Sequence, residues 1–388
     1  LITSDGGPQA HTAILARGLG LPAIVAAKGV TDIADGTVVY VDSNEGIVDT
    51  EPTDADREAA IKYANRKPVA DFDGKGVLAD GTRVELYANV GDGKSAEKAA
   101  SLKAEGVGLL RTEFGFLGHD AEPSIETQAK TYKSVFDAFP GKHIVVRTLD
   151  AGADKPLPFL NVNPEENPAL GVRGFRTDWT VPGVLTRQLQ AIKAASEDSD
   201  ADIWVMAPMI STTSEARNFA NMLKEIGLPV HGVMVETPAA VMNAEAILGE
   251  VDFVSIGTND LTQYTMAADR LLGDLAHLNN PWQPAVLKMI KMTVEGAQRA
   301  SVTAGKKKYV SVCGEAAADP ALAVVLIGLG VDTLSMNAGA IPAVAAVLKS
   351  VTKEKAQQIA AIALQQISSA EAKESARKAL PILDELGL

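Results

Sequence analysis

The chain has a single cysteine among its 388 residues and fewer basic than acidic side chains. Cys313 has no partner for a disulfide within the chain, which fits a reducing compartment and predicts a cytosolic protein. The 36 Lys and Arg against 49 Asp and Glu give a formal net charge of -13, so a basic surface for nucleic acid is not expected. An anionic ligand would have to be bound locally, by a few arginines placed in one site.

Long apolar runs are missing as well. The longest, residues 321–330, is well short of the roughly 18 residues that a membrane-spanning helix needs, so no membrane span is expected. The chain starts at Leu1, with no charged segment followed by an apolar one, and we therefore expect no secretory signal and interpret the chain as truncated at its N-terminus. A composition with 46% hydrophobic and 22% charged residues excludes a disordered or fibrous protein.

The first part of the chain predicts a small α+β unit followed by a linker. A glycine turn and a helical pattern come first, and short alternating strands are predicted at residues 38–41 and 47–48. Residues 51–67 are polar and helix-prone, and Pro52 and Pro68 flank them in the way expected for a connecting helix. The sequence therefore predicts three parts, a small unit, a linker helix and a large domain: residues 1–50, 51–68 and 69–388.

Short apolar strands alternate with helical stretches through the large domain. This alternation indicates a parallel sheet of the α/β class, and eight units in about this length favour a closed (β/α)8 TIM barrel over an open sheet. The intervals 150–203 and 259–309 are longer than a plain unit requires, so we expect insertions there, at the mouth of the barrel. The strands are predicted at residues 84–90, 107–111, 144–148, 203–208, 232–236, 253–257, 309–313 and 333–336.

Polar and charged side chains stand where most of these strands end. Packing alone predicts Val, Ile or Ala there, since a charged group is seldom fully buried unless it is paired. Active sites of (β/α)8 barrels are built from the carboxyl ends of the strands, so this face is the expected active site. Six strand ends carry such groups, at Asn89, Arg111 to Glu113, Arg147 to Asp150, Glu236-Thr237, Asn259-Asp260 and Cys313 to Glu315.

Two arginines and two acids in this set indicate an anion and metal site. Arg111 and Arg147 carry planar forks of donors that suit carboxylate and phosphate oxygens. Glu236 and Asp260 end neighbouring strands, and Mg2+ prefers such hard oxygen ligands while it keeps positions open for substrate and water. The same four residues could instead pair as salt bridges at the rim of the barrel, and the residues alone leave both interpretations open.

Cys313 and His11 are the remaining candidates. A thiol at the barrel mouth could deliver a proton to a carbanion-like centre, and its alternative is a small buried apolar residue. His11 follows a glycine turn at the start of a helical pattern, where helix N-terminal amides would favour a phosphoryl group on its ring. The alternative for His11 is a neutral cap of the helix.

Five segments of the chain resemble the phosphoenolpyruvate-utilising enzymes. They include His11 to Arg17, the run from Gly108 to Phe114, and the highly specific run from Ser255 to Tyr264, together with Arg147 to Asp150 and Val233 to Ala240. The Arg-Thr-Glu-Phe run at 111–114 favours the enzyme I branch of the family, which serves bacterial sugar phosphotransferase systems, over pyruvate phosphate dikinase. The likeness covers nearly the whole chain, and it implies a partial phosphohistidine swivelling domain before the barrel.

The resemblance also implies a role for each candidate. His11 matches the phosphorylated histidine, and Cys313 matches the acid that protonates the enolate. Glu236 and Asp260 match the Mg2+ ligands, and Asp260 also lies against the substrate. The substrate's phosphate and carboxylate are implied to be gripped by Arg111, Arg147, Arg173, Asn259 and Arg270; Arg173 and Arg270 lie in the long intervals, where spacing alone does not find them.

The implied activity is transfer of the phosphoryl group of phosphoenolpyruvate to His11 and then to a histidine-containing phosphocarrier protein, with release of pyruvate. The small domain would swing on its linker, and the family implies a homodimer through the barrel. Pro8-Gln9-Ala10 and Ala153 depart from the family pattern, and the domain that docks the phosphocarrier is missing. Alternatives are a dikinase or phosphoenolpyruvate synthase, and a sensor that binds phosphoenolpyruvate without catalysis; Glu236, Asp260 and Cys313 together disfavour the sensor.

Overall fold

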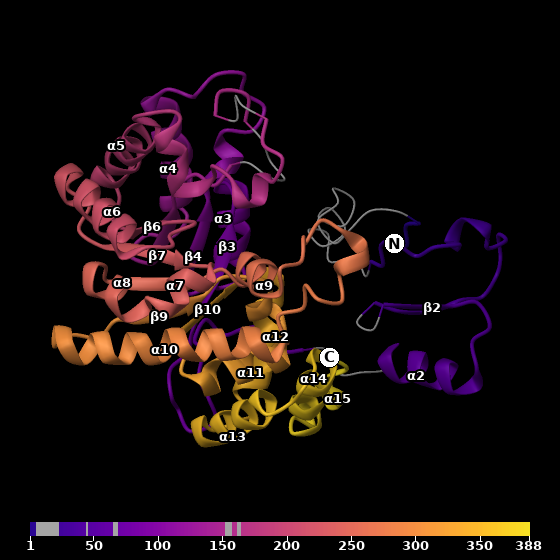
Figure 1. Cartoon of the computed structure of the whole chain (residues 1–388). Helices are drawn as coiled ribbons and strands as arrows, with labels where there is room; N and C mark the ends of the chain where they lie inside the picture. The colour runs from indigo at the N-terminus through magenta and orange to yellow at the C-terminus, as the bar shows by residue number, and fades with distance from the viewer. Residues whose placement is uncertain (5–22, 44–45, 65–68, 152–156, 161–163) are drawn as a thin grey trace.

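The computed structural model describes residues 1–4, 23–43, 46–64, 69–151, 157–160 and 164–388 (Figure 1). Eight parallel strands close into a barrel in the order β10-β3-β4-β5-β6-β7-β8-β9, which confirms the predicted α/β barrel. Each strand begins and ends within one residue of its predicted bounds. The strands are β3 (Glu85–Val90), β4 (Gly106–Arg111), β5 (His143–Arg147), β6 (Asp202–Ala207), β7 (His231–Val235), β8 (Phe253–Ile256), β9 (Tyr309–Val312) and β10 (Thr333–Met336).

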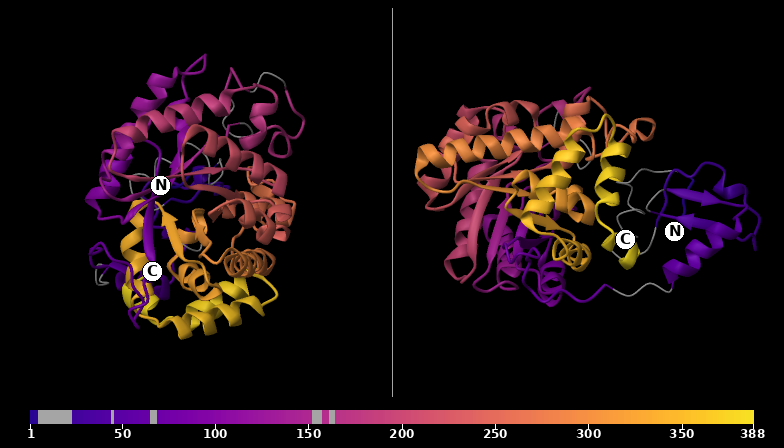
Figure 2. Two further views of the ribbon diagram at one scale, coloured as in Figure 1. Left: turned by 90° about the vertical axis from the view of Figure 1, so that its left-hand side faces the viewer. Right: turned by 90° about the horizontal axis from the view of Figure 1, so that it is seen from below.

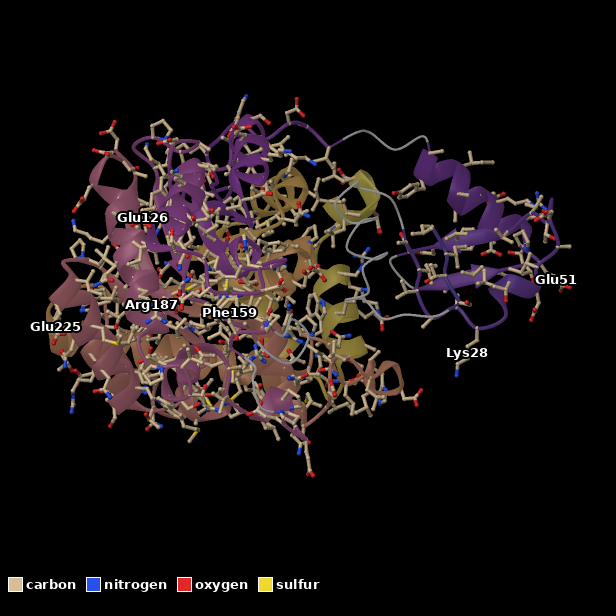
Figure 3. All side chains as sticks on the ribbon, turned by 90° about the horizontal axis from the view of Figure 1, so that it is seen from above. Lys28, Glu51, Glu126, Phe159, Arg187 and Glu225 are labelled. Carbon is tan, nitrogen blue, oxygen red and sulfur yellow. The ribbon has the colours of Figure 1, made fainter. Side chains whose placement is uncertain are left out.

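Helices surround the barrel because each one buries an apolar stripe against the strands (Figure 1). α6 shows how the sequence sets such a helix: the Thr212 side chain accepts from the Glu215 amide and the Glu215 side chain accepts from the Thr212 amide, which satisfies two free donors at the helix start. Its buried face includes Phe219 and Leu223, and burial of each such side chain contributes about 1.5 to 3 kcal/mol. The opposite face carries Glu225, which points away from the barrel (Figure 3).

The helices of the barrel wall follow the strands in the expected alternation, with short extra turns at the mouth. They are α3 (Gly93–Ser101), α4 (Ile125–Phe136), α5 (Val184–Glu197), α6 (Thr213–Ile226), α7 (Pro238–Met242), α8 (Ala244–Glu250), α9 (Thr258–Met266), α10 (Pro284–Ala304), α11 (Pro320–Leu329) and α12 (Ile341–Leu348).

Both predicted insertions lie at the carboxyl ends of their strands. The first, between β5 and α5, contains the 3-10 turns η3 (Pro168–Leu170) and η4 (Gly174–Trp179). The second separates α9 from α10 and contains η5 (Gly273–Leu275). The insertions add backbone around the mouth without entering the sheet, so they can bring side chains over the barrel axis.

The amino-terminal end of the barrel interior is closed by rings. The His143 ring lies edge-on to Trp204 with 4.1 Å between centroids, and Tyr87 lies 5.3 Å from His143. Trp204 also approaches Phe253 at 5.0 Å and Tyr309 at 6.1 Å. Because large rings fill this end, the interior is a packed core below the cavity at the carboxyl-terminal mouth.

A small N-terminal unit lies beside the barrel (Figure 2). It contains the antiparallel strands β1 (Tyr40–Asp42) and β2 (Ile47–Asp49) and the helix α2 (Asp54–Ala64), close to where the sequence predicts two strands and a helix. Lys28 and Glu51 of this unit lie far from the barrel (Figure 3). The division of the chain at residues 50 and 68 stays a prediction.

The C-terminal segment is helical and packs outside the barrel. Its helices are α13 (Lys353–Leu364), α14 (Ser369–Lys378) and α15 (Ile382–Leu386). α13 lies against α11, and α14 and α15 lie on the side of the barrel nearest the N-terminal unit (Figures 1 and 2). Within the described part of the chain, no helix combines the length and the apolar character that crossing a bilayer requires.

Candidate active site

A cavity of about 430 Å³ opens at the carboxyl-terminal mouth of the barrel. Its walls come from the ends of several strands and from both insertions. Every predicted site residue apart from His11 lines it: Arg111, Arg147, Arg173, Glu236, Asn259, Asp260, Arg270 and Cys313. His11 lies outside the described residues, so the structure places eight of the nine predicted residues in one cavity and says nothing of the ninth.

Arg147 is buried at the end of β5 and is held by acids on two sides. Its Nη2 donates to Glu113 Oε1 at 2.7 Å, and its Nη1 lies 3.6 Å from Asp150 Oδ2. Burial by itself lowers the pKa of Arg147, but Glu113 and Asp150 more than offset this and raise it above its usual value. The guanidinium is therefore permanently charged and fixed in direction, with Arg111 beside it at the end of β4.

Arg173 lies in the first insertion and bridges two carboxylates. Its Nε and Nη2 donate to the two oxygens of Asp150 at 3.1 and 2.8 Å, and its Nη1 donates to Asp260 Oδ1 at 2.8 Å. Arg270, in the second insertion, donates to Asp260 Oδ2 at 3.0 Å. Burial opposes ionisation of Asp150, yet Arg173 and Arg147 lower its pKa to about 2. The two insertions thus meet through Asp260, at the first turn of α9.

Glu236 is buried at the end of β7 with one oxygen in use. Its Oε1 accepts from the Met209 amide at 2.7 Å, and Met209 itself has the uncommon φ of 60° for a residue with a side chain. A Cβ added to Gly257 would lie 2.5 Å from Glu236 Oε2, so this glycine leaves the space that the carboxylate occupies. Burial, then Asp260 and Asp150, raise the pKa of Glu236 to about 8.

The donor set around Glu236 fits a hard divalent cation. A raised pKa means that the isolated carboxylate is an unfavourable anion, and a bound cation removes that penalty. Among the residues that the structure describes, no three His, Cys, Asp or Glu side chains converge as a metal cluster. The two carboxylates of Glu236 and Asp260, which line the same cavity, suit Mg2+, because this ion is commonly bound by one or two protein carboxylates together with substrate phosphate and water.

Cys313 lies at the end of β9, where its side chain joins the apolar interior of the barrel. Its neighbours there include Leu109 and Met234, and its Sγ lies 3.8 Å from the carbonyl oxygen of Ile256. Burial raises the pKa of the Cys313 thiol. The group is therefore a protonated thiol at neutral pH, buried in the wall of the cavity and able to donate a proton.

Salt bridges form in this cavity, but with partners other than those the sequence suggests: Arg147 pairs with Glu113, and Asp260 pairs with Arg173 and Arg270. They are not at the rim, however: the side chains of Arg173, Asp150 and Asp260 are each less than a tenth exposed. Transfer of each charge from water into the protein costs several kcal/mol, and pairing offsets this cost in part or in full. Apolar residues of similar volume would stabilise the barrel to an equal degree. A buried charge network in a cavity is therefore better explained by ligand binding than by stability.

The sequence alone predicts no role for Glu113 and Asp150, the acids that pair with the arginines. Glu113 and Asp150 follow the predicted ends of β4 and β5, and this position was the one signal that pointed to them. Asn89, at another strand end, donates through Nδ2 to the main-chain oxygen of Cys313 at 2.9 Å. No periodicity or spacing could have predicted these pairings, because their members lie up to 224 residues apart.

Comparison with known proteins shows which family has matching domains. Residues 69–353 match the PEP-binding domain of PEP-utilising enzymes, and residues 1–46 match the mobile domain of the same enzymes. A phosphoenolpyruvate-protein phosphotransferase of Streptomyces coelicolor is 46% identical over 383 residues, which are 98% of this chain and 68% of that protein. One from Haloferax volcanii is 39% identical, over 96% of this chain and 67% of that protein.

A multiphosphoryl transfer protein of Xanthomonas campestris is also similar, with 40% identity over 94% of this chain and 44% of its own length. The chain spans about two thirds of the length of the two phosphotransferases above. With these relatives and both family domains matched in order, the chain belongs to the PEP-utilising enzymes, in the branch of the phosphoenolpyruvate-protein phosphotransferases.

Proposed function

We propose that this chain transfers the phosphoryl group of phosphoenolpyruvate to His11 and then to a histidine-containing phosphocarrier protein, with release of pyruvate. This is the first step of sugar uptake by a phosphotransferase system. The observation that carries the proposal is the mouth cavity, where four arginines, two acids suited to a divalent cation and a protonated thiol lie together. The names of the relatives support the same reaction.

The arginines supply what phosphoryl transfer most needs. The reaction depends on positioning and on neutralising charge, because the transferred group carries its negative charge on several oxygens. Arg111, Arg147, Arg173 and Arg270 surround the cavity, and we assign them to the phosphate and carboxylate of the substrate. Asn259, at the start of α9, adds a neutral donor to the phosphate. Because acids already fix Arg147 and Arg173, their donors need little reorganisation when the substrate arrives.

Glu236 and Asp260 are assigned to Mg2+, with Asp260 also against the substrate. When bound, Mg2+ would neutralise negative charge on the phosphate and on the departing enolate oxygen. The Met209 amide orients the Glu236 carboxylate from behind, and Arg173 and Arg270 orient Asp260. These contacts fix the direction of the two carboxylates before any ligand binds.

Cys313 is assigned to the last chemical step. When the bond between phosphorus and the enol oxygen breaks, its electron pair stays on oxygen as an enolate. The double-bond pair of the enolate then forms a C–H bond with the proton of the Cys313 thiol, and the sulfur keeps the S–H electron pair as a thiolate. Water restores that proton. The raised pKa of the thiol supports this role, since a weakly acidic group holds its proton until the enolate forms.

His11 is assigned to a swivelling unit of the N-terminal region. We propose the domain division 1–50, 51–68 and 69–388, in which the unit swings toward the mouth to take the phosphoryl group and away to pass it on. α2 lies within the proposed linker. The single cysteine supports action in a reducing, cytosolic compartment.

We also propose a homodimer through the barrel. Large apolar side chains are exposed on the segments that surround the mouth, among them Leu170 and Trp179 in the first insertion and Met242 after β7. Exposed apolar side chains of this size favour burial in an interface. Sedimentation at micromolar concentration should give twice the chain mass, and Trp179→Glu should shift it toward the monomer. A monomer at every concentration would contradict the assignment.

Calorimetry with phosphoenolpyruvate tests the proposed function directly. We expect binding with Mg2+ present, and a loss of at least about tenfold in affinity for Arg147→Ala, which removes a charge-assisted contact. Arg187→Ala is the matched control: this arginine, on α5, is also paired with a carboxylate, Glu122, but it does not line the cavity. Equal affinities in both variants, or no binding by the unmodified chain, would contradict the proposed function.

A further inference from the structure

A polar seam crosses the barrel interior just below the mouth. The Ser335 hydroxyl on β10 donates to Asn89 Oδ1 on β3 at 2.6 Å, and Asn89 Nδ2 donates to the main-chain oxygen of Cys313 at 2.9 Å. Ser335 is fully buried, and Asn89 is half-buried and lines the cavity. One chain of hydrogen bonds therefore joins three adjacent strands and ends on the peptide that carries the thiol.

The hydrogen bonds of the seam begin where the main-chain pairing between β9 and β10 ends. β9 pairs with β10 only at Ser311 and Val312, so the Cys313 carbonyl lies one residue beyond the ladder. On the other side, the Cys313 amide donates to the Ile256 carbonyl at 3.2 Å. Because the side chain of Asn89 reaches past β10 to the carbonyl, the Cys313 peptide is held at both its N–H and its C=O.

Ser335 has little freedom to leave this arrangement. A Cβ added to Gly108 on β4 would lie 2.5 Å from both Cβ and Oγ of Ser335, so the glycine leaves the space that Ser335 occupies. The Cys313 carbonyl only accepts, so it takes the nitrogen of the Asn89 amide as its donor, and this leaves the amide oxygen to accept from the Ser335 hydroxyl. The space left by Gly108 on β4 thereby places the hydroxyl that supports the Asn89 amide from its oxygen side.

From these contacts we propose that Asn89 and Ser335 are positioning residues for Cys313, which hold its thiol at the height and angle needed to protonate the enolate at carbon. The inference rests on the proposed function, since it takes Cys313 as the proton donor. Neither residue is assigned to the phosphate, the carboxylate or the metal. Both act through the Cys313 main chain, so they should matter for proton transfer and not for substrate binding.

Exchange of the methyl protons of pyruvate with D2O, followed by proton NMR with Mg2+ present, isolates this step. It runs through the same thiol: the small thiolate fraction of Cys313 takes a methyl proton to give the enolate, the resulting S–H exchanges with D2O to S–D, and this deuteron is then delivered to carbon. It needs no phosphoryl transfer, so it is independent of His11. Calorimetry with phosphoenolpyruvate and circular dichroism of each variant report binding and folding separately.

We expect Asn89→Asp, which loses the amide donor at constant size, to slow exchange by about 10- to 100-fold, the cost of displacing a reacting group by about 1 Å. Ser335→Ala should slow it in the same direction and decides the matter if Asn89→Asp does not fold. Phosphoenolpyruvate should bind Ser335→Ala within twofold of the unmodified chain, and it should bind Asn89→Asp more weakly, because the new carboxylate lines the anion cavity. The exchange rate of Asn89→Asp, relative to that of the unmodified chain, should recover at low pH, because the new carboxyl is then protonated and can donate a hydrogen bond again.

Ser311→Ala is the matched control, since this hydroxyl also lies on β9, two residues before Cys313, but contacts the Val254 carbonyl instead. Its exchange rate should stay within twofold. If Cys313→Ala loses exchange while folded Asn89→Asp and Ser335→Ala keep it, the positioning inference alone is overturned. If Cys313→Ala exchanges at the unmodified rate, the proposed proton donor is wrong and this inference falls with it.

Discussion

Asp150 binds Arg173 with both carboxylate oxygens, at 3.1 Å from Nε and 2.8 Å from Nη2. Asp150 follows β5 and Arg173 lies 23 positions further along, in the first insertion. The pair therefore ties the start of η4, in the first insertion, to the rigid end of a strand. Arg173 also donates to Asp260, in the first turn of α9. Arg173 therefore links the first insertion both to the end of β5 and to α9.

Asp150→Asn should weaken the contact with Arg173, and it should lower both the unfolding free energy and the affinity for phosphoenolpyruvate. Loss of one member of a buried ion pair costs about 3 to 5 kcal/mol, and an amide that keeps one hydrogen bond should reduce that to about 2 to 3 kcal/mol of unfolding free energy. Phosphoenolpyruvate should bind about tenfold more weakly, because Arg173 and Arg147 lose the anion that fixes them. Urea unfolding and calorimetry measure the two effects.

Glu122→Gln is the control for that prediction. Glu122 binds Arg187 through the same two-oxygen geometry, at 2.9 and 2.7 Å, but the Arg187 side chain is 40% exposed. A solvent-exposed pair contributes less than about 1 kcal/mol, so the control should change little. An Asp150→Asn variant as stable and as tight-binding as this control would show that the buried pair has no positioning role.

The metal assignment predicts a separate loss in Glu236→Gln. The amide keeps the size of the side chain but removes the charge that attracts a divalent cation, so Mn2+ binding, measured by electron paramagnetic resonance, should weaken by about tenfold or more. Glu315→Gln changes an exposed acid in the same cavity and should bind Mn2+ normally. In EDTA, phosphoenolpyruvate should bind all three proteins with the same reduced affinity. Metal affinity unchanged by Glu236→Gln would rule the assignment out.

The barrel could be predicted from the sequence because its strands obey a local rule. Each strand of a parallel barrel is covered on both faces, so it appears as a short apolar run between helical stretches, and the ends of those runs predict the mouth. This is why Arg111, Arg147 and Glu236 could be found from position alone. Arg173 and Arg270 follow no period, since their places over the cavity depend on the path of the insertions, and only resemblance to a family pointed to them.

The pairings inside the site could not be predicted for a different reason. The seam from Ser335 through Asn89 to Cys313 joins residues 246 and 224 positions apart, and it depends on which side chains face inward at the same height of the closed barrel. The left-handed backbone of Met209, which aims an amide at Glu236, has no sequence signal such as glycine or asparagine. Such features are set by tertiary packing and not by local propensity.

A pH dependence of stability is expected at the opposite end of the barrel. Asp252 accepts hydrogen bonds from the His231 ring and from Lys306. Burial opposes its ionisation, but these two hydrogen bonds and the charge of His231 lower the pKa of Asp252 below its usual value. An acid with a lowered pKa in the folded state binds fewer protons there than in the unfolded chain. Its stabilising effect is therefore complete above about pH 4 and is lost as the pH falls further.

Asp252→Asn should accordingly reduce the unfolding free energy by about 1 to 2 kcal/mol at pH 7 and by progressively less below pH 4. Glu245→Gln, which breaks an exposed pair with Arg299, supplies the comparison. Denaturant unfolding at several pH values measures both. A difference between Asp252→Asn and the unmodified chain that stays constant from pH 7 to pH 3 would contradict the assigned pKa shift.

Cys313→Ala separates a proton donor from a small packing residue. General acid catalysis is worth about 100- to 10,000-fold, so pyruvate formation should fall by that factor if protonation at carbon limits turnover. Phosphoenolpyruvate should bind nearly as before, because the thiol acts on the departing enolate and not on the bound substrate. Phosphorylation of the histidine can persist in the variant, since that half-step precedes protonation.

A cysteine that only fills space in the barrel interior predicts the reverse pattern, with a loss of about 1 kcal/mol in stability and near-normal turnover. Measuring pyruvate formation and melting temperature on the same variant distinguishes the two, and turnover within a few-fold of the unmodified protein would exclude Cys313 as the acid.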